Sequence, residues 1–359
     1  MIPKPPFACD LTLEAELAAF ERLKPRLAQV WSALTANDDE ACTSVVVPSM
    51  SLDQSELSKL TGASFYEERL LFLLIRLRNP RAHVVYVTSQ PVHPMILDYY
   101  LNLLTGVPAS QARGRLTMLA AYDSSARPLT AKILERPRLI QRIRYTIPDS
   151  SRAFLTVFNS TPLERKLSVL LDVPLNGLDP SLQHLGTKSG GRRVFLEAGV
   201  EMPTGFENLT SRADALDALI ELRRRCPIVK RAVLKLNHSF SGEGNAVFSC
   251  PRENSRGEMD ESLTRLDFSM PTETADSYFE KFGAMGGIVE EMVEGPQSAS
   301  PSAQFRTGPR GEVLPISTHD QIPVSQESFR GTAAEIRAIG CGHARTPAER
   351  RIVHHLEET

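Results

Sequence analysis

A lysine and a glycine-rich turn stand close together in the stretch LKLNHSFSGEGNAVF, residues 234–248. Lys235 lies in an apolar, strand-like run, where an unpaired ammonium group is costly, so we expect an anionic partner or ligand beside it. Gly242 and Gly244 then permit backbone conformations that other residues avoid, and such a turn lets backbone amides approach a phosphate closely. This combination indicates either a phosphate-binding hairpin or an ordinary turn between two strands.

The spacing of these glycines excludes two nucleotide-binding motifs and disfavours a third. No G-x-x-x-x-G-K-[ST] run of a P-loop occurs in the chain. The run GEGNAV has Val247 where a dinucleotide fingerprint needs a third glycine, and it leads into a strand instead of a helix. A protein kinase has its glycine-rich loop before the strand lysine and carries later HRD and DFG motifs. Here Lys235 comes first and neither motif follows, so a kinase-like phosphotransferase is disfavoured.

The overall composition is that of an ordinary globular protein. The 359 residues are 42% hydrophobic and 23% charged, which is enough for two or more domains. A formal net charge of -2 provides no field that would attract nucleic acid or an anionic membrane, so neither partner is expected. The five cysteines lack CxxC spacing, and no apolar run is long enough to span a bilayer. We expect a cytoplasmic protein and leave open whether it forms a homo-oligomer.

The first half of the chain alternates strand-like and helix-like segments. Apolar side chains three or four apart predict an amphipathic leading helix over residues 13–34, within an N-terminal helical extension over residues 1–40. Four strand-like runs follow, separated by helix-like sequence: TSVVV, HVVYV, RLTMLAA and AFLTVF. This alternation predicts an α/β fold with a parallel sheet, a Rossmann-like domain over residues 41–178. The loops PSMS and TSQPVHP, at the carboxyl ends of two strands, are either a substrate rim or ordinary surface turns.

A basic run lies inside this predicted domain. Residues 112–152 carry nine Arg or Lys against three acidic residues, a local charge of +6. Solvated helix faces account for most runs of this kind, and an anion site is the alternative. No stacked aromatic residues interleave with the basic ones, which further weakens a nucleic-acid interpretation.

The second half of the chain predicts a smaller α+β region. The segment GTKSGGRRVFLEAG predicts a short helix that ends at Gly199. Ser211 and Asp214 form a capping box with Asp in place of Glu, which opens a helix over ADALDALIELRRR. The runs AVLKLN and AVFS predict a β-hairpin, and GGIVEEMVEG predicts one further strand.

The order of these segments closely resembles the ATP-grasp superfamily. The segment TKSGGRRVFLEAGVEMPTG, the lysine strand, the glycine-rich hairpin and the acidic strand end VEEMVEG follow one another as they do there. Four runs look more particularly like the peptide ligases of pheganomycin-type biosynthesis: TSQPVHPMILDYYLNLLTGVP, LTAKILERPRLIQRI, HLGTKSGGRRVFLEAGVEMPTG and KLNHSFSGEGNAVF. The resemblance runs from about Cys42 to Asp320. It implies a Rossmann-like pre-ATP-grasp domain, a small lobe with its hinge over residues 179–293, and an incomplete large lobe with a divergent tail over residues 294–359.

The resemblance also implies an activity. Members of the family join a carboxylate to an amine through an acyl phosphate made with ATP. It therefore implies ATP and Mg²⁺ as cofactors, and small-molecule or peptide carboxylates and amines as substrates. No nucleophilic side chain is required, because the charges of the metal and of lysine stabilise the transferring phosphoryl group.

The site residues that the resemblance implies fall into three groups. Those at the phosphates are Lys188, Lys235, Ser241, Gly242, Gly244 and Asn245. Those at the adenine are Glu290, Glu291 and Val293. Those facing the γ-phosphate or the substrate are Arg306 and His319. Plainer alternatives are a solvated helix-start lysine, a surface acidic pair, and an Arg and a His with structural roles at strand ends.

The end of the chain departs from the family pattern. Members carry an acidic residue on one strand and a Glu-x-Asn run on the next as Mg²⁺ ligands, and no such pair appears here, so the metal ligands are unknown. The tail over residues 332–359 is unfamiliar, and its histidines and Cys341 lack the spacing of a zinc site. Two hypotheses follow: an ATP-dependent carboxylate–amine ligase, and a catalytically silent nucleotide-binding remnant of one.

Overall fold

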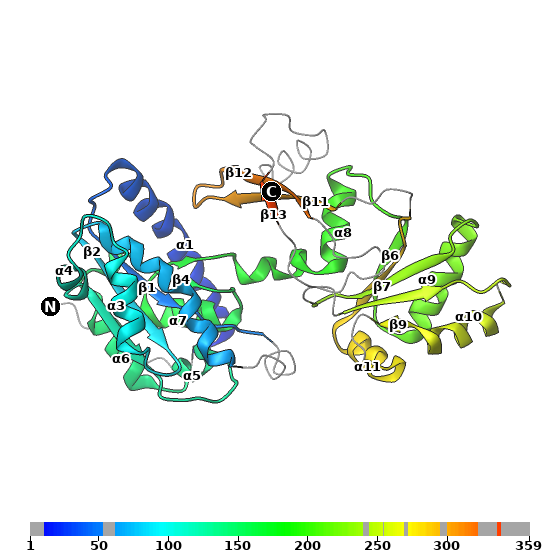
Figure 1. Ribbon diagram of the computed structural model, residues 1–359, viewed down its shortest axis with the longest axis horizontal. Coiled ribbons are helices and arrows are strands. Elements are labelled where there is room, and N and C mark those ends of the chain that lie inside the picture. Colours follow the sequence, from blue (N-terminus) through cyan, green and yellow to red (C-terminus); the bar gives the residue numbers. More distant parts are fainter. Residues whose placement is uncertain are drawn as a thin grey trace. The chain divides into compact units, whose positions relative to one another are not determined.

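The computed structural model describes residues 11–52, 62–239, 244–253, 255–268, 272–294, 300–321 and 336–338. The chain divides into two compact units, Met1–Gln183 and His184–Thr359. Figure 1 colours the first from blue to green and the second from green to red. None of the helices in the described ranges combines the length and the apolarity that crossing a membrane requires.

The first unit is built on a five-stranded parallel sheet with the strand order β3-β2-β1-β4-β5. Its strands are β1 Cys42–Val47, β2 Ala82–Thr88, β3 Leu116–Ala120, β4 Ala153–Val157 and β5 Leu175–Asn176. The predicted α/β class, the parallel sheet and the four strand-like runs are confirmed. The two-residue β5 was not predicted, because it lies in the run PLNGLDPS, whose residues favour turns.

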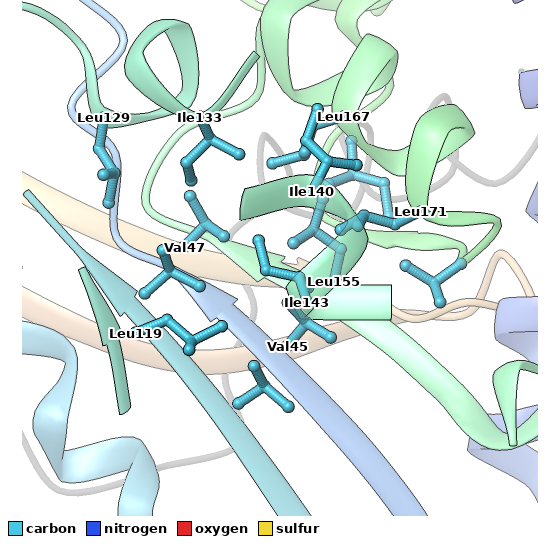
Figure 2. Close-up of a cluster of buried hydrophobic side chains, with 14 of the residues drawn as sticks. Val45, Val47, Leu119, Leu129, Ile133, Ile140, Ile143, Leu155, Leu167 and Leu171 are labelled. Carbon is cyan, nitrogen blue, oxygen red and sulfur yellow. The ribbon is translucent and has the colours of Figure 1, made fainter. Parts of the chain in front are cut away.

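Helices cover both faces of this sheet (Figure 1). They are α1 Leu13–Ala36, the 3₁₀ helix η1 Ala63–Arg78, α3 Pro94–Asn102, α4 Ala109–Arg113, α5 Leu129–Leu134, α6 Pro137–Tyr145, η2 Ser150–Arg152 and α7 Pro162–Leu171. Val45 and Val47 pack with α1, α5, α6 and α7, as Figure 2 shows for the side chains of that cluster. Val46 and Tyr86 pack on the opposite face with η1, α3 and α4. Burial on both faces explains why the strands are almost continuously apolar.

Two of the helix-like segments between the strands form helices of a kind that the sequence analysis did not specify. The segment before β2 is the 3₁₀ helix η1, and its buried Leu71, Leu74 and Leu77 recur every three residues, as three residues per turn require. The helix-like segment between the third and fourth strands is two helices, α5 and α6. Pro137 begins the second of these, and Arg136 before it has a non-helical backbone.

The second unit contains a five-stranded antiparallel sheet with the order β6-β10-β7-β8-β9. Its strands are β6 Gly205–Leu209, β7 Arg231–Leu236, β8 Asn245–Ser249, β9 Asp267–Phe268 and β10 Gly287–Glu291. Its helices are α8 Lys188–Glu197, α9 Arg212–Arg225, α10 Arg256–Ser262, η4 Leu263–Arg265 and α11 Ala275–Met285, after η3 Pro180–Gly186 at the boundary of the units. The β7–β8 hairpin, the single strand β10 and the end of α8 before Gly199, whose φ is +63°, confirm the predictions.

The predicted capping box at the start of α9 is only half formed. Ser211 accepts a hydrogen bond from Asp214 N at 3.0 Å, as predicted. The carboxylate of Asp214 binds Thr210 N at 2.9 Å instead of the backbone of Ser211. In the usual motif the Glu side chain accepts from the backbone N–H of the N-cap residue. Here the shorter Asp214 accepts from Thr210 N, one residue before the N-cap Ser211.

The antiparallel sheet has one fully apolar face. Ala232, Leu234 and Leu236 of β7 are buried with side chains of α9, α10 and α11. Val233 and Lys235 alternate with them and are only half-buried. The second face of the sheet is therefore formed by the residues of the other parity: Val233, Lys235, Asn245, Val247, Ile288 and Glu290.

A separate three-stranded antiparallel sheet ends the described chain. It contains β11 Ser300–Thr307, β12 Val313–Gln321 and β13 Ile336–Ala338 in that order. The incomplete large lobe expected over residues 294–359 remains a prediction.

Candidate functional site

Lys235, on the second face of the antiparallel sheet, has an anionic partner. Its Nζ donates to Glu290 Oε1 on the neighbouring strand β10. The lysine side chain keeps 29% of its surface exposed, whereas that of Glu290 keeps 11%. The expected charge partner is therefore confirmed, and the ammonium group stays within reach of a ligand from solvent.

Glu290 is shared with a second cation, Arg192 of α8, which sequence analysis missed. Arg192 Nη1 donates to Glu290 Oε2 at 2.9 Å and to Pro203 O at 3.0 Å. Its Nε lies 3.4 Å from Glu207 Oε2, and its side chain is only 7% exposed. Each oxygen of the buried carboxylate thus binds one cation, an arrangement that offsets the cost of removing these charges from water.

One sequence signal for Arg192 existed. It lies four residues after Lys188, and that spacing puts both cations on one side of α8. Its carboxylate partner, however, is 98 residues away along the chain, so the pairing itself was not visible.

Backbone contacts with Asn237, directly after β7, fix the start of α8. Asn237 Oδ1 accepts from Ser189 N at 2.9 Å, and Asn237 O accepts from Lys188 N at 3.3 Å. Gly190 is needed in this turn, because a Cβ there would come within 2.0 Å of His184 O. These contacts hold Lys188 next to the end of the lysine strand.

Lys188 shares the electrostatic environment of Lys235 and Glu290. Burial lowers the pKa of Lys188, the charge of Lys235 lowers it further, and the carboxylate of Glu290 raises it. Lys188 is half-buried, which does not fit the alternative of a fully solvated helix-start lysine. The site has three cations, Lys188, Arg192 and Lys235, for the two carboxylates of Glu207 and Glu290, so an added anion would be attracted to it.

The structure describes only part of the glycine-rich turn. Asn245 pairs opposite Lys235 in the β7–β8 ladder, so the two lie side by side on the second face. Ser241 and Gly242 lie outside the described residues. Their predicted role at the phosphates therefore stays a prediction.

Gly244 is required by a close approach within the hairpin. A Cβ on Gly244 would come within 2.3 Å of Ser239 Cβ. Its carbonyl oxygen accepts from Tyr278 Oη at 3.2 Å and from Leu236 N at 3.0 Å. The hairpin is thus anchored to the core just where the turn returns to β8.

The residues predicted at the adenine have different surroundings. Glu290 is buried, so the alternative of a surface acidic pair is wrong for it. Glu291 Oε1 accepts from Thr204 N at 2.9 Å, which fixes the end of β10. Val293 is 75% exposed beyond that end and is free to contact a ligand.

Arg306 and His319 lie on the separate sheet of β11 and β12. Arg306 pairs opposite Leu314, whereas His319 pairs opposite Ser302, so the strand register separates them. His319 Nε2 lies 2.7 Å from Ser317 Oγ, and its Nδ1 is buried with no hydrogen-bond partner among the described residues. Their predicted catalytic roles remain predictions.

The described residues do not fit a Mg²⁺ site. In the ranges that the structure covers, no group of three or more His, Cys, Asp or Glu is placed to hold a metal ion. The two carboxylates of the site, Glu207 and Glu290, are occupied by Arg192 and Lys235.

Comparison with known proteins identifies similar sequences. Residues 180–271, which include α8 and the β7–β8 hairpin, match the family model described as IQCH-like, ATP-grasp. An L-propargylglycine–L-glutamate ligase of Streptantibioticus cattleyicolor is 28% identical over 291 residues, 79% of this chain and 59% of the relative. IQ motif-containing protein H of Danio rerio is 24% identical over 95% of this chain and 36% of its own length. The chain thus spans less than two thirds of either relative.

Solved structures are also similar, at a low level. The ADP complex of an N5-carboxyaminoimidazole ribonucleotide synthetase is 12% identical with a TM-score of 0.47, over 89% of this chain and 64% of that chain. D-alanyl-alanine synthetase A of Vibrio cholerae is 10% identical with a TM-score of 0.43, over 89% of this chain and 80% of that chain.

Proposed function

We propose that the chain is an ATP-grasp protein and acts as an ATP-dependent carboxylate–amine ligase of peptide type, because residues 180–271 match an ATP-grasp family model and a ligase is 28% identical to the chain. One observation carries the proposal. Lys235 pairs with the buried carboxylate of Glu290, the charges of both act on Lys188, and both lysines fall within the segment that matches the ATP-grasp family. Two ammonium groups next to a glycine-rich turn suit a polyphosphate ligand.

ATP would supply a phosphoryl group to the substrate carboxylate with release of ADP, and an amine would then displace phosphate from the resulting acyl phosphate to form an amide. Lys188 and Lys235 would hold the negative charge of the phosphates, which is the main task of the protein in phosphoryl transfer. Arg192 makes this possible. Because it continues to hold Glu290, Lys235 can turn from that carboxylate to a phosphate without leaving a buried charge unpaired.

The remaining site residues are proposed for neighbouring parts of the nucleotide. Ser241, Gly242, Gly244 and Asn245 would cover the β- and γ-phosphates. The end of β10, with Glu290, Glu291 and Val293, would meet the adenine. Arg306 and His319 would face the γ-phosphate or the substrate, and Mg²⁺ would need ligands from outside the described residues.

Amino acids or short peptides are the proposed substrates. The ligase of Streptantibioticus cattleyicolor is named for L-propargylglycine and L-glutamate, so two amino acids are the first pair to test. The chain spans 59% of that relative, and its own substrates are therefore part of the proposal.

The test is incubation of the full chain with ATP, Mg²⁺, L-glutamate and a panel of amino acids and dipeptides. A ligase releases phosphate and ADP only when both a carboxylate and an amine are present, and mass spectrometry then detects the amide. Hydroxylamine in place of the amine traps the acyl phosphate as a hydroxamate. The Lys235→Ala variant should lose both signals.

The other outcomes separate the alternatives. ATP binding without phosphate release under every substrate pair would support the catalytically silent remnant. A phosphorylated product that accumulates without amide would support a phosphotransferase. Absence of ATP binding would contradict all three nucleotide-dependent functions.

A further inference from the structure

A cavity of about 370 Å³ lies within the first unit, among α1, α6 and α7. Its volume falls at the lower end of the range for sites that hold one small molecule. Three arginines and one aspartate line it: Arg22 and Arg26 from α1, Arg144 from α6, and Asp172 just after α7. The rest of the wall is mainly apolar and includes Leu23 and Leu170.

Arg26 and Asp172 neutralise each other in the wall of the cavity. Arg26 Nη1 donates to Asp172 Oδ1 at 3.0 Å, and Nη2 donates to the carbonyl oxygens of Asp172 at 3.1 Å and Ser150 at 2.5 Å. The other carboxylate oxygen of Asp172 accepts from Ser150 Oγ at 3.4 Å. Arg26 thereby caps the end of α7 and pairs with the carboxylate of Asp172.

Arg22 and Arg144 differ from Arg26 in having no counter-charge. Within the described part of the chain, neither guanidinium makes a hydrogen bond or an ion pair. Both nevertheless line the same cavity. Two unpaired guanidinium groups at one cavity repel each other, and an anion between them would remove that repulsion.

The basic run over residues 112–152 shows that most basic side chains of this unit have a partner. Most of its members are engaged: Arg113 with Asp98, Arg127 with Glu135, Arg136 with Asp123, and Arg152 with Glu40. Arg115 and Lys132 donate to backbone carbonyls. The three arginines of α6 have no such partner in the described part, and of these only Arg144 lines the cavity, while Arg138 and Arg142 are exposed on other faces of the helix.

We propose that this cavity binds a small organic anion. Its carboxylate or phosphate group would lie between Arg22 and Arg144, whose planar guanidinium groups match both oxyanions in geometry. Its apolar part would pack against Leu23 and Leu170. The site belongs to the first unit alone and does not depend on the proposed ligase activity.

Phenyl phosphate is a suitable probe, because it combines an oxyanion with an apolar ring. We expect calorimetry on the full chain to detect binding that Arg22→Gln and Arg144→Gln each weaken about tenfold, as loss of one charge-assisted contact predicts. Inorganic phosphate should bind more weakly than phenyl phosphate, since it lacks the apolar part. A parallel titration with benzoate tells whether the site prefers phosphate or carboxylate.

Two matched variants make the test specific. Arg138→Gln removes a charge from the same helix outside the cavity and should leave the affinity unchanged. Lys235→Ala should also leave it unchanged, because that lysine belongs to the second unit. The proposal is overturned if the native chain does not bind the probe, if Arg138→Gln weakens binding as much as Arg144→Gln, or if only Lys235→Ala weakens it.

Discussion

The parallel sheet of the first unit and the antiparallel sheet of the second differ in how completely their faces are covered. Val45, Val46 and Val47 of β1 are all 0% exposed, so both faces of that sheet are core. In β7, buried side chains alternate with the half-buried Val233 and Lys235. A sheet covered on both faces leaves ligands only its edges and loops, whereas a sheet with one partly covered face can present charged side chains along its strands.

One lysine in each unit shows the same difference. Lys132 in the first unit is 1% exposed, and its Nζ donates to Ser89 Oγ at 2.8 Å and to the carbonyl oxygens of Asp123 and Ser125. All its hydrogen bonds are internal, so it serves the fold. Lys235 in the second unit has one carboxylate partner and keeps access to solvent, so it is available for a ligand.

The largest effect is expected in the parallel sheet, because both of its faces are buried. Leu155→Ala removes a fully buried side chain from the cluster that packs α1, α5, α6 and α7 on the sheet, and it should lower the free energy of unfolding by about 4 kcal/mol. Val247→Ala, on the half-covered second face, should cost about 1 kcal/mol. The single tryptophan, Trp31 of α1, reports the first unit, so urea titration followed by its fluorescence should shift for Leu155→Ala alone. Equal shifts for both variants would contradict the comparison.

The next largest effect on stability is expected at Glu290, whose carboxylate is shared by Arg192 and Lys235. Arg192→Met leaves Glu290 with one cation in a buried position, and we expect a loss of about 3 kcal/mol in the free energy of unfolding. The double variant Arg192→Met/Glu290→Met removes both charges and should recover most of that loss. Urea unfolding followed by far-ultraviolet circular dichroism measures each variant. Additive losses in the double variant would show that the two side chains do not interact.

A third prediction concerns the availability of Lys235. Lys235→Ala should weaken ATP binding by about a hundredfold or more, because it removes an ammonium group that binds phosphate. The fold should survive, since Arg192 still pairs with Glu290. Lys230→Ala is the matched control, an exposed lysine just before the same strand. Calorimetry that gives the same ATP affinity for the Lys235 variant and the native chain would remove Lys235 from the site.

The smallest expected effect is a pH dependence from Lys188. In the folded chain, burial and the charge of Lys235 lower the pKa of Lys188 below its ordinary value of 10.5, and the carboxylate of Glu290 only partly offsets this. Between the two pKa values the unfolded chain binds more protons, so the contribution of Lys188 to stability rises with pH in that window. Lys188→Met lacks this contribution and should be the more stable form at neutral pH. Its advantage in urea titrations should narrow as the pH approaches 10.5, and a constant difference would contradict the lowered pKa.

Sequence patterns predicted those parts of the fold and site that depend on near neighbours. The alternation of AVLKLN predicted the strand and the need for a charge next to Lys235, and Glu290 supplies it. The helix of GTKSGGRRVFLEAG was predicted because Gly199 marks its end. Arg192 was missed although it lies on that helix, since what gives it a role is a contact with a strand far along the chain.

By itself, the sequence determined the order of strands and helices, the hairpin around the glycine-rich turn and the likeness to ATP-grasp ligases. The strands, helices and hairpin follow from periodicity and local backbone preferences, which act over a few residues, whereas the likeness is a resemblance of whole sequence segments. Only the tertiary structure decided that Lys235 and Arg192 share one carboxylate. It also decided that Arg144 of the basic run lines one cavity with Arg22 of α1. Charge pairing depends on distances in space, and those are fixed only when the core brings distant segments together.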